Sequence, residues 1–137
     1  MNTPAPTDAP ERPQGEPAIR TIAMPADANP AGDIFGGWLM AQMDLAAGNV
    51  AARRARGRCA TVSVDRINFL QPVYVGDEVS LYADITRIGR TSMTIRVEAW
   101  RRARDGEDQV RVTDAHFVFV ALDQGGRPRI IGPGPQG

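Results

Sequence analysis

The chain of 137 residues contains no lysine, one cysteine and one histidine. A single cysteine excludes an internal disulfide framework and any metal site built from several thiolates. Its place in the apolar pattern Cys59-Ala60-Thr61-Val62 favours a buried structural thiol over a reactive one. The 16 basic and 16 acidic residues cancel, so no overall electrostatic field indicates nucleic acid or an anionic membrane as a partner.

Long apolar runs are also missing from the sequence. No run reaches the roughly 18 residues of a membrane span, and the N-terminus lacks the basic-then-apolar order of a secretory signal. We therefore expect a cytoplasmic protein that does not enter the membrane. The length corresponds to one domain that can bury a substantial core.

Both ends of the chain lack the side chains that a core needs. Residues 1–16 are rich in proline and acidic residues and almost free of large apolar groups, so we expect a disordered tail. Residues 132–137 are mostly glycine and proline and are expected to fray. The predicted single domain therefore spans residues 17–131.

Between these ends the pattern predicts one helix and five strands. The helix is expected from about Gly37 to Arg54, apolar nearly all round in its first half and stopped by Gly57. Alternation of polar and apolar residues predicts the strands, and short turns such as Gly89-Arg90 imply antiparallel pairing. The predicted strands are residues 18–24, 59–70, 78–88, 91–103 and 109–122. One helix wrapped by a curved antiparallel sheet is an α+β architecture, the hotdog fold.

One carboxylate stands inside the apolar helix. In the run GDIFGGWLMAQMDLAAGNV, the residues one turn away from Asp44 are Met40, Ala41, Ala47 and Gly48, and none of them pairs with a charge. One explanation is a structural acid bonded to backbone or to a neighbouring subunit. The other is an acid placed for catalysis, which the site must supply with hydrogen-bond donors.

Three segments together resemble a known family. They read MPADANPAGDIFGGWLMAQMD, VSVDRINFLQPVYVGDEVSLYADITRIGRTSMTIRVEAWRR and VTDAHFVFVALDQGGRPR, within about residues 18–131. The chain resembles the YciA-type acyl-CoA thioesterases of the hotdog superfamily. The resemblance implies hydrolysis of acyl-CoA to free acid and CoA, with no metal and no further cofactor. It also implies double-hotdog dimers, commonly assembled as a trimer of dimers.

The resemblance places the catalytic acid of the family on Asp44, as a general base or a nucleophile. Gly36 and Gly37 stand where the loop meets the helix, and they let a ligand carbonyl approach backbone N–H groups at the positive helix pole. The pair could equally form a tight turn into the helix. Thr61 aligns with a small polar residue near the family's reacting centre, where it would orient Asp44 or hold water. Ordinary strand preference explains Thr61 at least as well.

Two further sets of residues complete the predicted site. The turn residues Arg90, Thr91 and Ser92 offer N–H and guanidinium groups to CoA phosphates, although a solvated turn has the same composition. The acyl pocket is expected among the helix residues Trp38, Met40 and Met43.

Two other functions fit the same fold. Hotdog hydratases depend on a histidine paired with an acid, but His116 lies in the last predicted strand, far along the chain from the helix. This alternative is therefore disfavoured. A hotdog protein could also bind an acyl-CoA or an acyl carrier without hydrolysing it. The presence of Asp44 argues against mere binding, and a thiol-release assay would decide between the two.

Overall fold

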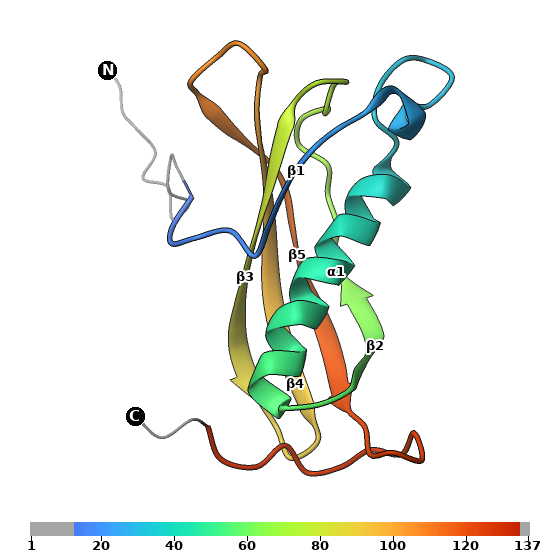
Figure 1. Cartoon of the computed structure of the whole chain (residues 1–137), viewed down its shortest axis with the longest axis vertical. Helices are drawn as coiled ribbons and strands as arrows, with labels where there is room; N and C mark the ends of the chain where they lie inside the picture. The colour runs from blue at the N-terminus through green and yellow to red at the C-terminus, as the bar shows by residue number, and fades with distance from the viewer. Residues whose placement is uncertain (1–12, 135–137) are drawn as a thin grey trace.

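A computed structural model of the chain describes residues 13–134. Most of the predicted tail, residues 1–12, and the end of the predicted frayed segment, residues 135–137, lie outside the described residues. The elements are β1 (Ile19–Ile22), a short 3-10 helix η1 (Pro25–Asp27), α1 (Gly36–Ala55), β2 (Cys59–Asp65), β3 (Glu78–Ile88), β4 (Ser92–Arg102) and β5 (Gln109–Ala121), as Figure 1 shows. Within this part of the chain, no helix combines the length and the apolar character needed to cross a membrane.

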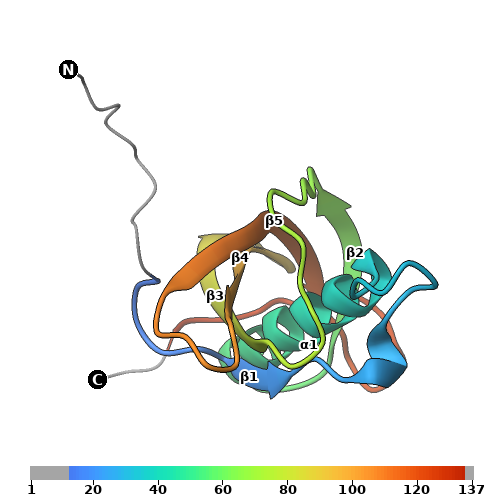
Figure 2. The same ribbon diagram turned by 90° about the horizontal axis from the view of Figure 1, so that it is seen from above.

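The five strands form one antiparallel sheet in the order β1-β3-β4-β5-β2. Strands β3, β4 and β5 pair in chain order, whereas β1 and β2 join the two edges from distant points of the sequence. Seen from above, the sheet curls around α1 (Figure 2). The predicted hotdog architecture, one helix held by a curved antiparallel sheet, is confirmed.

The core lies between α1 and the concave face of the sheet. The helix turns small residues toward the sheet, and Ala46, Ala47 and Ala51 are completely buried. Alternate residues of β3, β4 and β5 face them, as the two-residue period of a strand requires. Because these helix residues are small, the helix lies close to the sheet. A Cβ atom on Gly48 would stand 3.5 Å from the ring of Phe119.

The predicted strand over residues 59–70 is wrong in its second half. β2 ends at Asp65. Arg66 takes a left-handed backbone conformation with φ 53°, which turns the chain out of the sheet. Residues 66–70 therefore form a loop, although the apolar Ile67, Phe69 and Leu70 are typical of a strand.

The C-terminal end of the helix also differs from the prediction. Arg56, not Gly57, adopts the left-handed conformation that ends α1, with φ 55°. Gly57 instead leaves room for a side chain, because a Cβ atom there would stand 2.8 Å from Nη2 of Arg129, which would have to move aside. That guanidinium donates a 2.7 Å hydrogen bond to the carbonyl of Ala55 and so satisfies one free acceptor at the negative helix pole.

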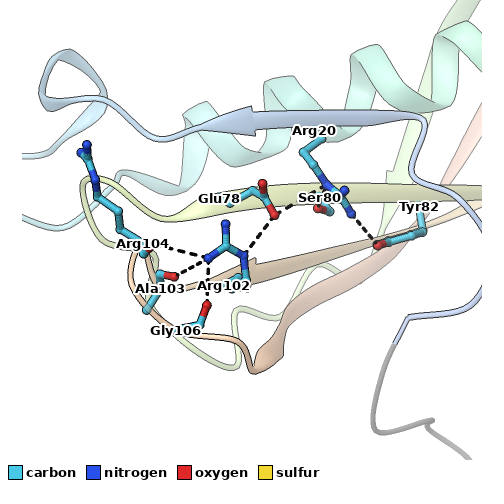
Figure 3. Close-up of polar contacts among 8 residues, drawn as sticks. All are labelled: Arg20, Glu78, Ser80, Tyr82, Arg102, Ala103, Arg104 and Gly106. Carbon is cyan, nitrogen blue, oxygen red and sulfur yellow. Dashed lines mark hydrogen bonds and ion pairs between the residues drawn. The ribbon is translucent and has the colours of Figure 1, made fainter.

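A polar network ties the short strand β1 to the sheet (Figure 3). Glu78 of β3 lies between two guanidinium groups, with Oε1 at 3.7 Å from Nε of Arg20 and 3.3 Å from Nε of Arg102. Arg20 also donates a 2.8 Å hydrogen bond to the hydroxyl of Ser80. Arg102 donates to carbonyl groups of the turn between β4 and β5. One carboxylate thereby links β1, β3 and the end of β4.

Candidate active site

Asp44 lies on the side of α1 next to the edge strand β2. Its Oδ1 accepts a 2.5 Å hydrogen bond from the hydroxyl of Thr61. Asp44 is half-buried, Thr61 is exposed, and no basic side chain of residues 13–134 forms an ion pair with the carboxylate. The fold thus places the hydroxyl of Thr61 as a hydrogen-bond donor to Asp44, and both residues were singled out from the sequence.

The first turn of α1 presents unpaired N–H groups. Phe35 precedes the helix in an extended conformation, and no side chain caps it. The N–H of Trp38 donates to the carbonyl of Phe35 at 3.1 Å. The N–H groups of Gly36 and Gly37 have no partner among the described residues. Two donors therefore stand free at the positive pole of a 20-residue helix.

The acid and these donors are far apart within one chain. Gly37 and Asp44 are separated by seven positions, which corresponds to roughly 10 Å along the helix axis at about 1.5 Å per residue. Reacting atoms must approach to about 3–3.5 Å, and oxyanion donors stand about 3 Å from the oxygen that they stabilise. A single copy therefore brings Thr61 to Asp44 but leaves the two glycines apart from them.

The surface along β2 and the loop after it, from Asp44 toward the start of α1, is apolar. β2 is an edge strand that is exposed from Thr61 to its end. Large exposed apolar side chains lie on β2, on the outward side of α1 and on the loop after β2: Leu45, Val62, Val64, Phe69 and Leu70. An unpaired strand edge bordered by apolar side chains is typical of a surface that another chain covers.

Of the three residues predicted to bind CoA phosphates, Arg90 and Thr91 lie in the turn between β3 and β4, and Ser92 is the first residue of β4. The side chain of Arg90 is exposed, and Thr91 and Ser92 are half-buried. Backbone hydrogen bonds hold the turn in place, because the carbonyl of Arg90 accepts from Ile131 and that of Thr91 accepts from Ala121, both at 2.9 Å. The end of β5 and the C-terminal segment thus fix the backbone of the turn, while the side chain of Arg90 stays exposed.

The residues predicted for the acyl pocket differ in exposure. Met43 is completely buried in the core, Trp38 is half-buried and Met40 is 39% exposed. None of them lines a cavity of about 240 Å³ at the start of α1, here named the helix-start cavity. Its apolar lining residues are Ile34, Leu39, Phe69, Pro72, Val73 and Val112. Sequence reasoning missed this cavity because three segments distant in the sequence form it, residues 29–39, residues 69–73 and Val112.

His116 is exposed on β5, level with Asp65 of β2 and Arg96 of β4. It forms no ion pair with an acid within residues 13–134. In the part of the chain that the structure describes, no group of three or more His, Cys, Asp or Glu side chains could hold a metal ion. His116 and its cross-strand neighbour Asp65 thus form no ion pair among the described residues, and the structure adds no support to the hydratase alternative.

Cys59 should react slowly with alkylating reagents. Burial raises the pKa of its thiol, and the positive charge of Arg129 opposes this only in part. Because the thiolate is the nucleophile, we expect iodoacetamide at neutral pH to modify the native protein several-fold more slowly than the unfolded chain. Mass spectrometry of a time course measures both rates. Equal rates would show that the fold does not protect this thiol.

Comparison with known proteins places the chain in a family. Residues 31–106 match the Thioesterase superfamily. The acyl-CoA thioester hydrolase YciA of Salmonella typhimurium is 48% identical over 120 residues, which are 85% of this chain and 90% of that protein.

Two solved structures extend the comparison. A hexameric hotdog fold thioesterase of Campylobacter jejuni is 37% identical with a TM-score of 0.82, over 86% of this chain and 91% of that chain. A hexameric broad specificity acyl-coenzyme A thioesterase, crystallised as an aspartate-to-alanine mutant enzyme, is 44% identical with a TM-score of 0.83, over 87% and 88% of the two chains. The chain therefore belongs to the thioesterase superfamily, among its YciA-type acyl-CoA thioester hydrolases.

Proposed function

We propose that this protein hydrolyses acyl-CoA to a free acid and CoA, with Asp44 as the group that activates water or attacks the thioester carbon. The hydrogen bond from Thr61 to Asp44 carries this proposal. It holds Oδ1 and leaves Oδ2 without a partner among the described residues. A carboxylate oriented by one neighbour, with its second oxygen available, has the arrangement that base or nucleophilic catalysis needs.

Two routes lead from this arrangement to the same products. As a base, Asp44 takes a proton from water while the water oxygen bonds to the thioester carbon, and the resulting oxyanion then expels the CoA thiolate, which is protonated. As a nucleophile, Asp44 displaces the thiolate to give a mixed anhydride, which water then hydrolyses. Both routes place negative charge on the former carbonyl oxygen. The N–H groups of Gly36 and Gly37 are the proposed donors to it, and one such donor is typically worth about 3 kcal/mol.

We place the CoA phosphates at Arg90 and Thr91 of the turn between β3 and β4 and at Ser92, which begins β4. A guanidinium that reaches solvent from a fixed turn suits charge-assisted hydrogen bonds to phosphate oxygens. Backbone hydrogen bonds to Ile131 and Ala121 keep this turn in place. Ligand binding therefore costs less conformational entropy than it would at a flexible turn.

We further propose that two copies of the chain build each active site. Within one helix, Asp44 lies roughly 10 Å from the start of the helix, which is too far for both to contact one thioester group closely. In a two-fold interface the same surface of both copies meets, so that each contact occurs twice. If the β2 edges meet, the helix start of one copy faces Asp44 of the other, and two equivalent sites result.

This assembly makes a prediction for the free protein. We expect at least a dimer, and a hexamer as in the hexameric relatives, because the β2 edge and its apolar side chains need a cover. Val62→Asp on β2 should shift the protein toward monomers and lower its activity per chain, as measured by light scattering and thiol release. Ile22→Asp, which changes an exposed apolar residue of β1 at the opposite edge of the sheet, is the matched control. A stable and fully active monomer would contradict the proposal.

A thiol-release assay tests the proposed activity directly. Purified protein is mixed with acyl-CoA substrates from acetyl-CoA to palmitoyl-CoA, and free CoA thiol is followed with a chromogenic disulfide. Hydrolysis releases thiol in proportion to time and enzyme concentration. A protein that only binds acyl-CoA gives a binding isotherm but no thiol, and that result would favour the binding alternative.

A further inference from the structure

The interior of the helix-start cavity is apolar. Ile34, Leu39, Val73 and Val112 line it and are each at most 8% exposed, so their side chains are firmly packed walls. Phe69 closes the cavity from the loop after β2 and remains 47% exposed. Cavities of this composition bind apolar groups, because moving a methylene group from water into an apolar site is favourable.

The polar lining of the cavity belongs to its rim. Asn29 points its amide oxygen into its own loop, where it accepts from the N–H groups of Ala31 at 2.9 Å and Asp33 at 3.1 Å. Asp33 and Gln71 also line the cavity, but both are exposed and therefore stand at its mouth. The interior thus has no charged group to receive a polar ligand.

Hydrogen bonds on both sides of Phe69 fix its backbone. On one side of it, the carbonyl of Asn68 accepts a 2.6 Å hydrogen bond from the hydroxyl of Thr113. On the other side, the N–H of Leu70 donates to the carbonyl of Val112 at 2.7 Å. The two bonds hold the loop against β5, while the ring of Phe69 stays 47% exposed. Phe69 is therefore a wall of the cavity that stands on a fixed backbone and borders the solvent.

Gly36 joins the cavity to the proposed oxyanion site. It lines the cavity, and its N–H is one of the two free donors of the first turn. A Cβ atom there would stand only 3.1 Å from Cζ of Phe69, so ring and backbone are already in close contact. A carbonyl oxygen bound at this N–H places the carbonyl carbon, and the chain bonded to it, at the entrance of the cavity.

On the basis of the function proposed above, we propose that the helix-start cavity binds the acyl chain of the substrate and sets its length. The other part of the substrate next to the thioester, the pantetheine arm, carries amides that an apolar wall leaves unpaired. The volume of 240 Å³ holds about eight groups at roughly 30 Å³ for each water-sized unit. The preferred substrates are therefore short- and medium-chain acyl-CoA thioesters, up to about eight carbons.

The test is the chain-length profile of kcat/KM from acetyl-CoA to palmitoyl-CoA. For the wild type we expect a rise of about fourfold for each added methylene until the cavity is full, and no further rise beyond. Val112→Phe fills the floor and should lower the ratio of octanoyl-CoA to acetyl-CoA activity by at least about tenfold. Phe69→Ala opens the wall and should move the optimum to longer chains. Ile130→Ala, exposed at the far end of the chain, is the control.

Val112 is completely buried, so circular dichroism must first show that its variant folds, and Val112→Leu replaces it if it does not. The half-exposed Phe69 can be truncated without disturbing the core. If substitutions at Val112 and at Phe69 both leave the chain-length profile of kcat/KM unchanged, while the wild type hydrolyses acyl-CoA, the cavity assignment alone is overturned. A ratio that responds to Met40→Ala instead would assign the chain to the exposed side of the helix. A wild type that hydrolyses no acyl-CoA would overturn the proposed function and this inference together.

Discussion

Replacing Asp44 with asparagine should lower the turnover of acyl-CoA by at least about a hundredfold, because positioned base catalysis is typically worth a hundredfold to ten-thousandfold. Asparagine keeps the shape of the side chain, and its oxygen can still accept the hydrogen bond from Thr61. It lacks both the basicity and most of the nucleophilic power of the carboxylate. The loss should appear in kcat, measured by thiol release at saturating substrate.

Binding and assembly should survive this change. The apolar walls and the turn at Arg90 are untouched, so calorimetry should find CoA still bound and light scattering should find the same oligomer. The matched control is Asp84→Asn, an exposed acid of β3 that lies opposite Arg96 on β4. Retained hydrolysis in Asp44→Asn would show that this acid is structural, and the proposed mechanism would have to be abandoned.

Mixing two inactive variants should restore activity if two copies share each site. One variant is Asp44→Asn, and the other is Gly37→Val, whose branched side chain should push the thioester oxygen away from the N–H groups. In a mixed dimer, one site combines the Asp44 of the Gly37→Val chain with the Gly37 of the Asp44→Asn chain, so both residues of that site are intact. The other site carries both substitutions. Random mixing makes half of the dimers mixed, so about a quarter of the sites should recover.

The structure indicates that Gly37→Val will fold. Gly37 is exposed, and a Cβ atom there would stand 3.4 Å from the ring of Phe35, an ordinary contact. Gly37→Ala, with a smaller side chain, should lose less activity than Gly37→Val. The two inactive chains can carry different tags, so that tandem purification isolates mixed oligomers before the assay. Mixed oligomers that are as inactive as either parent would show that each chain builds its own site.

The sequence by itself determined the elements, the fold class and the family. The alternation in residues 78–88 predicted β3 with both ends correct, because turn residues bound an uninterrupted two-residue period. The helix was predicted to within one residue at either end, since its apolar run is long. Asp44 was found because an acid with no charged neighbour one turn away is unusual in such a run.

Only the tertiary structure decided which distant residues meet. Local periodicity carries no information about the partner of an edge strand, so the pairing of β1 with β3 and of β2 with β5 had to come from the folded chain. The same holds for the hydrogen bond from Thr61 to Asp44, which depends on where β2 passes the helix. Residues 66–70 include Ile67, Phe69 and Leu70, whose side chains favour strands and buried loops alike. The left-handed backbone of Arg66, which the sequence pattern does not reveal, decides that this segment is a loop. The helix-start cavity is the space left where these long-range contacts close, and no single segment of the sequence encodes it.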